Sequence, residues 1–125
     1  MTLKNTDNEY RIKVSNRQTI DSETDTIEET AYGNYTEKNG KQYITYKTEN
    51  DGDKISSMIK IDGNEILIKR TGSVNSSMTY KVDTKKEFLY HLPYGTVPME
   101  IETQRIVSKL DENGGTIELV YTLMV

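Results

Sequence analysis

The stretch from Lys54 to Gly72, KISSMIKIDGNEILIKRTG, constrains the fold more than any other part of the chain. On both arms the isoleucines fall at alternate positions, interrupted only by Ser57, and a β-strand would place them on one face. Between the arms, Asp62-Gly63-Asn64 supplies residue types that tolerate the positive φ of a tight turn. A two-residue loop, either Asp62-Gly63 or Gly63-Asn64, puts all these isoleucines on the same side, whereas a three-residue loop would set them against Lys60. The predicted apolar face contains Ile59, Ile61, Ile66 and Ile68.

The same alternation recurs along most of the chain, and no stretch shows a sustained helical period. It predicts eight or nine strands joined by short turns, within one domain that covers residues 1–125. We therefore expect an all-β, antiparallel up-and-down meander. Such a meander removes its edges best by closing into a barrel. The expected strands cover residues 10 to about 22, 24–36, 42–49, 55–61, 66–71, 78–83, 88–92, 97–110 and 117–125.

Three local signals refine this prediction. Ala31 and Gly33 lie on the expected inner face of strand 24–36, with Ile27, Glu29 and Tyr35, and small residues there indicate a bend or bulge. Asn39-Gly40 is a hairpin signal. A bulge is also predicted near Arg105, where two successive apolar residues blur the register. For strand 42–49, both faces are aromatic or β-branched, so the inner face stays open.

Composition excludes several classes of protein. A formal net charge of −4 and a pI near 5.1 argue against a nucleic-acid surface. The sequence has no cysteine, which rules out disulfides and thiolate metal sites. No segment has the length of a transmembrane helix or the apolar core of a signal peptide. We expect a monomeric cytoplasmic protein without cofactor or metal.

Four segments together resemble a known family: TAYGNY at 30–35, ITYKTE at 44–49, IKRTG at 68–72 and YGTVPMEIETQRI at 94–106. The set resembles the YwiB-like family of small, uncharacterised bacterial proteins. This resemblance implies a calycin-type, lipocalin-like barrel and carries no catalytic residues. Members of that family usually continue past the region of Leu123 into another strand, whereas this sequence stops at Val125. We therefore expect a truncated C-terminal strand and an open sheet edge beside it.

Catalytic signals are weak. His91 has no second histidine and no cysteine to work with, so a surface role is the preferred reading. Acidic pairs such as Glu28-Glu29 are interpreted as parts of solvent-exposed strand faces. Asp51-Gly52-Asp53 resembles the start of a calcium loop but lacks the glutamate that would complete it. The sequence predicts that the protein is not an enzyme.

Arg70 is the sharpest candidate for a functional residue. It continues the alternation of Ile66 and Ile68, which points it into the barrel near one mouth. A buried guanidinium must be paired or solvated, since an isolated buried charge is very costly. Its partner is either Glu29, in a structural pair, or the head group of an anionic ligand, and the structural pair is the preferred alternative.

Two functional hypotheses follow. The leading one is a small barrel that binds an amphipathic or anionic small molecule through Arg70 and Glu29. Interior hydroxyls from Tyr35, Tyr80, Tyr90 and Tyr121 would assist. The alternative is a protein-interaction module with a filled interior and no ligand. It would work through a tyrosine-rich outer face that includes Tyr32 and Tyr46.

Overall fold

The computed structural model describes residues 3–4, 10–92 and 94–124. Within these ranges the chain forms ten strands and no helix, which confirms the all-β class. The strands are β1 (Leu3–Lys4), β2 (Tyr10–Ile20), β3 (Glu23–Lys38), β4 (Lys41–Asn50), β5 (Asp53–Asp62), β6 (Glu65–Gly72), β7 (Ser76–Lys81), β8 (Lys85–Leu92), β9 (Gly95–Asp111) and β10 (Gly114–Met124).

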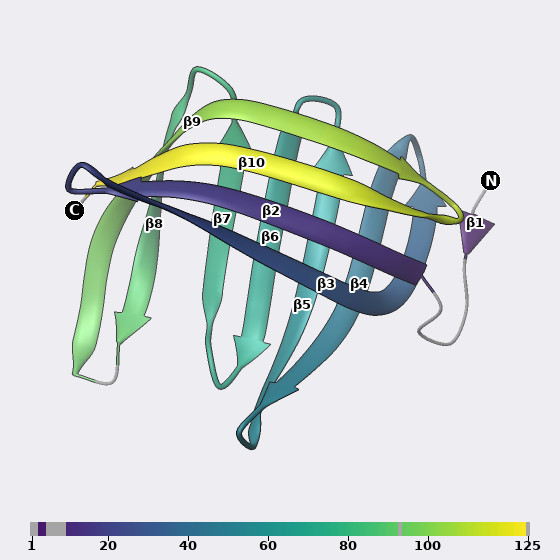
Figure 1. Ribbon diagram of the computed structural model, residues 1–125, viewed down its shortest axis with the longest axis horizontal. Coiled ribbons are helices and arrows are strands. Elements are labelled where there is room, and N and C mark those ends of the chain that lie inside the picture. Colours follow the sequence, from purple (N-terminus) through teal and green to yellow (C-terminus); the bar gives the residue numbers. More distant parts are fainter. Residues whose placement is uncertain (1–2, 5–9, 93, 125) are drawn as a thin grey trace.

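Nine of these strands form a nearly closed barrel in the order β7-β6-β5-β4-β3-β2-β10-β9-β8. In Figure 1, β2, β10, the first half of β3 and the second half of β9 cross in front of β4 to β8, which run nearly at right angles to them. Consecutive strands of a meander alternate in direction, so β10, the ninth strand of the circuit, runs the same way as β2. Their pairing is accordingly parallel, whereas the other ladders of the circuit are antiparallel.

The open edges of the barrel lie elsewhere than the sequence predicted. We expected an unpartnered C-terminal strand, but β10 is paired on both sides, with β2 and with β9. That expectation was wrong because the ends of a closed meander meet each other. The gap falls instead between β7 and β8, which end the strand order on its two sides. At one end of the gap, an isolated bridge joins Val82, just after β7, to Thr103 on β9.

The central hairpin has the predicted register. Ile59 lies opposite Ile68 and Ile61 opposite Ile66, and Asp62 pairs with Glu65, so the loop is Gly63-Asn64. Gly63 has a φ of 60°, as the first position of a tight hairpin turn requires. The Asn39-Gly40 turn is confirmed as well, with φ values of 54° and 77° between the paired residues Lys38 and Lys41.

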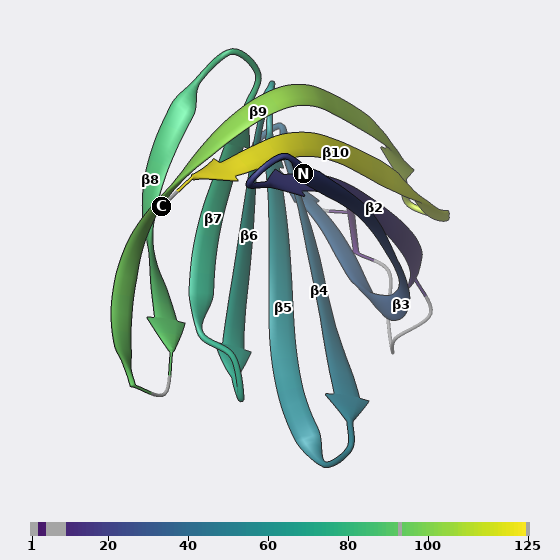
Figure 2. The same ribbon diagram turned by 60° about the vertical axis from the view of Figure 1, so that its left-hand side comes forward.

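Two irregularities shape the wall of the barrel. The first half of β3 pairs with β2, and β4 joins it only from Gly33 onward. There β3 bends sharply, as Figures 1 and 2 show. A side chain at Gly33 would collide with the carbonyl oxygen of Thr45, so the strands can approach only at a glycine. In β9 the register shifts beside Tyr121, whose partner is Thr103, while Val120 pairs with Arg105, which confirms the bulge predicted near Arg105.

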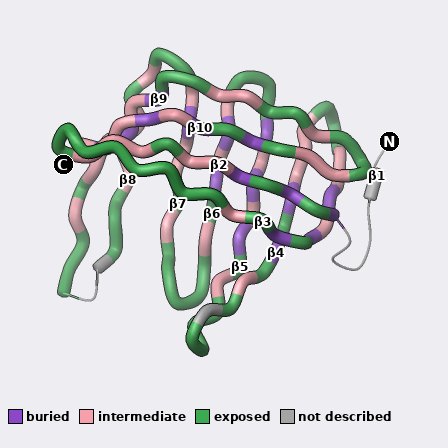
Figure 3. The backbone as a smooth tube through the Cα atoms, in the orientation of Figure 1, coloured by how far each residue is buried: buried purple, intermediate pink, exposed green. Residues whose placement is uncertain are grey.

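The core follows the predicted alternation along most strands and lies between the crossing layers, where Figure 3 shows the buried segments. On β4 the structure settles the open choice, because Ile44 and Tyr46 are buried. The alternative functional hypothesis placed Tyr46 on the outer face, and that placement was wrong. Ile27 was expected to face inward but is 53% exposed, because it precedes the point where β4 covers β3.

Candidate functional site

A pocket of about 260 Å³ opens into the barrel beside the gap between β7 and β8. It lies at the end of the barrel where β2 ends and β3 begins, far along the strands from Tyr10. Its wall is mostly apolar and comes from six strands and one loop. It is lined by Gln18, Ile20, Arg70, Val74, Ser76, Met78, Phe88, Tyr90, Met99 and Leu123.

Arg70 lies at the mouth of this pocket, as the alternation along β6 predicts. It pairs in register with Ser57 on β5 and Ser76 on β7, and it is half-buried. Ser57 is itself buried, so this row of residues faces the interior. No carboxylate forms an ion pair with Arg70 among the residues that the structure describes.

The predicted pair between Arg70 and Glu29 does not form. The Glu29 carboxylate instead accepts a hydrogen bond of 2.7 Å from the Tyr46 hydroxyl. Glu29 lies in the first half of β3, which does not pair with β4. The hydrogen bond therefore links β4 to a part of β3 from which it is separated. Sequence reasoning paired the two charges because it left the inner face of strand 42–49 open and so did not consider Tyr46 as a partner of Glu29.

The four candidate tyrosines separate into three groups. Tyr80 and Tyr121 are buried in the barrel, with ring centroids 5.0 Å apart in an edge-to-face arrangement. The Tyr121 hydroxyl donates to Gln18, which lines the pocket. Tyr90 lines the pocket directly and is 41% exposed. Tyr35 belongs to the opposite end of the barrel, where its ring stacks on Tyr10 with centroids 4.9 Å apart.

The positive charge of Arg70 reaches the buried phenols. Burial, followed by the nearby Glu29 carboxylate, raises the pKa of Tyr46 to about 12, while Arg70 acts in the opposite direction. Burial also raises the pKa of Tyr80 and Tyr121, and Arg70 again acts in the opposite direction on both. The guanidinium therefore favours negative charge within this part of the barrel.

Sequence reasoning missed most of the pocket wall. Phe88, Met99 and Leu123 were read as ordinary core positions on separate strands, and Gln18 was not singled out. They meet because β2, β8, β9 and β10 converge at this end of the barrel. The alternation predicts which way a side chain points, but not which strand ends lie together.

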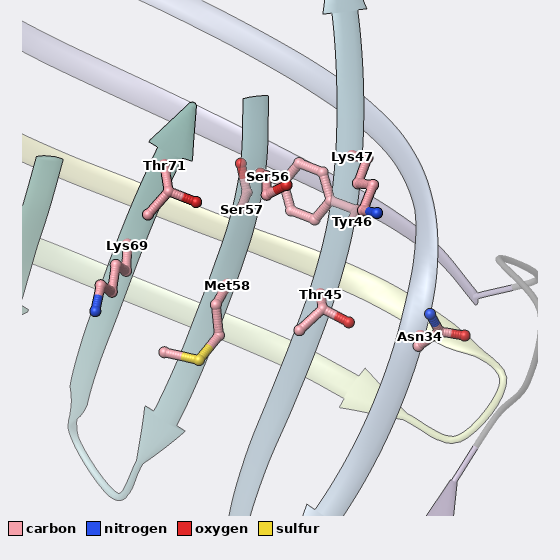
Figure 4. Close-up of a pocket in the computed structure, with 9 residues that line it drawn as sticks. All are labelled: Asn34, Thr45, Tyr46, Lys47, Ser56, Ser57, Met58, Lys69 and Thr71. Carbon is pink, nitrogen blue, oxygen red and sulfur yellow. The ribbon is translucent and has the colours of Figure 1, made fainter. Parts of the chain in front are cut away.

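A larger groove of about 430 Å³ lies on the outer face of β3 to β6 and is shown in Figure 4. Lys47 and Lys69 line this groove, together with Met58 and several hydroxyl groups. Both lysines are exposed, so water already solvates their charges. Contacts of exposed charges contribute little net free energy, which makes Arg70 the stronger anchor for an anion despite the smaller pocket.

In the described ranges no cluster of three or more histidine, cysteine, aspartate or glutamate side chains could hold a metal ion. His91 is exposed, and its ring nitrogen Nδ1 lies 3.3 Å from the Thr96 hydroxyl. The same part of the chain contains no helix with the length and apolarity that crossing a membrane requires.

These features define a small all-β barrel with an interior pocket at an open seam and a cation, Arg70, at its mouth. The chain belongs to the family described as a domain of unknown function, DUF1934, which matches residues 12–125. It is similar to the uncharacterised β-barrel protein YwiB of Bacillus subtilis (strain 168), with 29% identity over 105 residues. That match covers 84% of this chain and 74% of YwiB.

The crystal structure of YwiB from Bacillus subtilis is also similar in fold. It superposes with a TM-score of 0.72 at 28% sequence identity and covers 83% of this chain and 73% of the YwiB chain. The predicted barrel is confirmed, and it matches the fold of the solved YwiB structure.

Proposed function

We propose that this protein is a monomeric, non-catalytic binding barrel of the cytoplasm that takes an amphipathic anion into the pocket beside β7 and β8. The anionic group lies at Arg70, and the apolar part extends along Phe88, Met99 and Leu123. The observation that carries this proposal is the inward-facing guanidinium, which has no carboxylate partner in the described part of the chain.

The chemistry of the pocket supports an amphipathic ligand over a fully polar one. A half-buried cation in a mostly apolar wall is costly unless an anion or water accompanies it. A carboxylate can receive charge-assisted hydrogen bonds from guanidinium, which are about twice as strong as neutral ones. The Gln18 and Ser76 side chains add polar contacts beside it. The apolar wall then favours a hydrocarbon tail.

The barrel architecture supports the same role. A meander that is closed at one end and open at the other is consistent with the calycin-type, lipocalin-like barrel that the resemblance implies. An eight- or nine-stranded barrel has room for one small ligand. The alternative, an outward tyrosine-rich surface on a filled barrel, is weakened because Tyr46 is buried and only Tyr32, at 58% exposure, remains of the predicted pair.

Calorimetric titration with octanoate and with octanol tests the proposal, because the two probes share a tail and differ in head group. We expect octanoate to bind more tightly than octanol. Arg70→Met should weaken octanoate binding by about tenfold or more, the loss expected for a hydrogen bond to a charged group. Binding of octanol should change little.

Lys69→Met is the matched control, because Lys69 is the neighbouring cation on β6 and points to the outer face. It should leave octanoate binding unchanged. Equal losses in the two variants would show a general charge effect and contradict the proposal. So would an absence of octanoate binding to the unaltered protein, together with no retained anion in native mass spectra of protein purified from its own host.

A further inference from the structure

The backbone edges of β7 and β8 have an arrangement that the ligand proposal does not use. The two strands follow one another around the barrel wall and are joined by a turn of three residues, 82–84. No ladder connects them anywhere in the described chain, although such short connections usually produce hairpins. Each strand thus presents one row of backbone groups without a strand partner.

The turn explains why the gap stays open. The Asp83 amide donates to the carbonyl of Thr103 at 3.1 Å, so the turn is attached to β9. β8 then runs back along β9 from Lys85 opposite Glu102 to Leu92 opposite Gly95, while β7 stays with β6. The gap is held by ladders on its two sides, and Figures 1 and 2 show β7 and β8 on either side of it.

Exposed apolar side chains gather around this gap. Seven large hydrophobic residues of the described chain are exposed, and five of them belong to the segment from the β6–β7 loop to the β8–β9 turn. Leu89 on β8 is 56% exposed and Tyr94 is 87% exposed. Scattered exposed residues need no explanation, but a concentration beside an unpaired strand edge is typical of an interaction site. The five are Val74, Val82, Leu89, Tyr90 and Tyr94.

We propose that the gap between β7 and β8 takes an extended peptide segment of a partner protein by strand addition. Backbone hydrogen bonds to the two edges would provide affinity, and alternate side chains would enter the pocket or stay outside. The inference goes beyond the proposed function, because the affinity would come from the backbone edges of β7 and β8, although inward side chains of the insert would enter the same pocket.

The two strand edges that face the gap favour a single extended chain. An inserted strand has β7 on one side and β8 on the other, so a second folded sheet would collide with one of them. The inward neighbours of the insert are Met78 and Phe88, which favour apolar side chains. The outward neighbours include Ser77, Thr79 and Leu89, which favour β-branched or polar residues. β7 has 6 residues and β8 has 8, so an insert of about six residues matches them.

Charge narrows the chemistry of the insert. Lys81 and Lys86 lie on β7 and β8, and Arg70 lies on the neighbouring β6 and lines the pocket. None of the three forms an ion pair within the described ranges. Lys85 is already paired with Glu102, at 3.8 Å. The acidic side chains on the same strands and turn are Asp83 and Glu87. We therefore infer an insert with alternating apolar residues and at least one carboxylate.

The test begins with selection of random eight-residue peptides on the immobilised protein, followed by synthesis of the best binder. We expect an alternating apolar sequence with an acidic residue. Amide shifts in nuclear magnetic resonance spectra should concentrate on β7 and β8. Methylation of single backbone nitrogens in the peptide should weaken binding by tenfold or more at alternate positions. This modification leaves the protein unaltered, so misfolding cannot imitate its effect.

Leu89→Pro removes one backbone donor from β8 without touching the pocket wall, and Leu89→Ala controls for the lost side chain. We expect a larger loss of peptide affinity with proline, and octanoate binding unchanged in both variants. The inference is overturned if no peptide is selected, if binding ignores N-methylation or maps to the outer groove, or if the edge pairs with a second copy instead. In those cases, octanoate titration still tests the small-molecule proposal separately.

Discussion

The two ends of the barrel are built from similar residues but differ in how they are closed. At the closed end, Tyr10 stacks on Tyr35, and Gln42 donates both to the Tyr35 hydroxyl at 3.0 Å and to the Leu110 carbonyl at 3.3 Å. Gln42 therefore links β4 to β9 across the barrel. At the open end, Arg70 faces a pocket and has no ion-pair partner in the described chain.

This difference shows that inward polar groups have two uses in one barrel. At the closed end they connect strands and contribute to stability, although the Tyr10 hydroxyl itself finds no partner among the described residues. At the open end a polar group is left available, which costs stability and serves binding instead. Substitutions at the closed end should therefore reduce stability, and those at the open end should change ligand affinity.

Tyr35→Ala should produce the largest effect. It removes a ring that is 1% exposed, the stacking partner of Tyr10 and the hydrogen-bond acceptor of Gln42. We expect a loss of about 3–5 kcal/mol in the free energy of unfolding, measured by urea denaturation. The matched change at the open end, Tyr90→Ala, should cost about 1 kcal/mol or less. Similar losses for both tyrosines would contradict the contrast between the two ends.

Gly33→Ala should have the next largest effect. The added methyl group would meet the Thr45 carbonyl and the Tyr46 Cβ, at the point where β3 bends toward β4. We expect a destabilisation of about 3 kcal/mol from overpacking. Gly52→Ala, in an open turn with a φ of 85° and no atoms nearby, should cost only about 1 kcal/mol of backbone strain. A smaller loss at position 33 than at position 52 would show that the bend can relax.

Much of this architecture was predictable from the sequence for local reasons. Strand alternation depends on neighbouring residues, so the register of Ile59 with Ile68, the Asn39-Gly40 turn and the bend at Gly33 could all be predicted. The inward position of Arg70 followed from the same rule. The bulge near Arg105 was visible because two adjacent apolar residues cannot share a regular strand face.

The errors concern contacts between distant segments. The predicted ion pair between Arg70 and Glu29 does not form, because the Glu29 carboxylate accepts a hydrogen bond from Tyr46. The alternation had left open whether Tyr46 points inward or outward. The free edge was assigned to the C-terminal strand because nothing in the sequence shows that β10 pairs with β2. The pocket wall was missed for the same reason, since Phe88 and Leu123 are brought together only by closure of the barrel.

Ionisation of Tyr46 at alkaline pH should destabilise the barrel by less than the Gly33→Ala substitution. In the folded protein, burial raises the pKa of Tyr46 from its ordinary value of 10.0 to about 12. The unfolded chain therefore loses this proton first, and the stability that is fully present below pH 10 falls as the pH rises toward 12. One such group corresponds to roughly 2–3 kcal/mol across that interval. Urea denaturation at a series of pH values measures it, and Tyr46→Phe should flatten the decline.

Arg70→Met should produce the smallest change and the most specific one. At neutral pH we expect its effect on unfolding to lie within about 1 kcal/mol, because an apolar side chain replaces an unpaired charge. Above pH 10 the variant should lose stability more steeply than the unaltered protein. Arg70 lowers the pKa of Tyr46, Tyr80 and Tyr121, so its removal widens the difference between folded and unfolded values.

Two controls isolate the position of that charge. Arg70→Lys keeps a cation at the mouth and should preserve most of the original pH dependence. Lys69→Met removes a cation from the outer face of the same strand and should leave the alkaline decline unchanged. If Arg70→Met and Lys69→Met gave the same pH profile, the guanidinium would not act on the buried tyrosines. The open end would then lack the electrostatic feature that distinguishes it from the closed end.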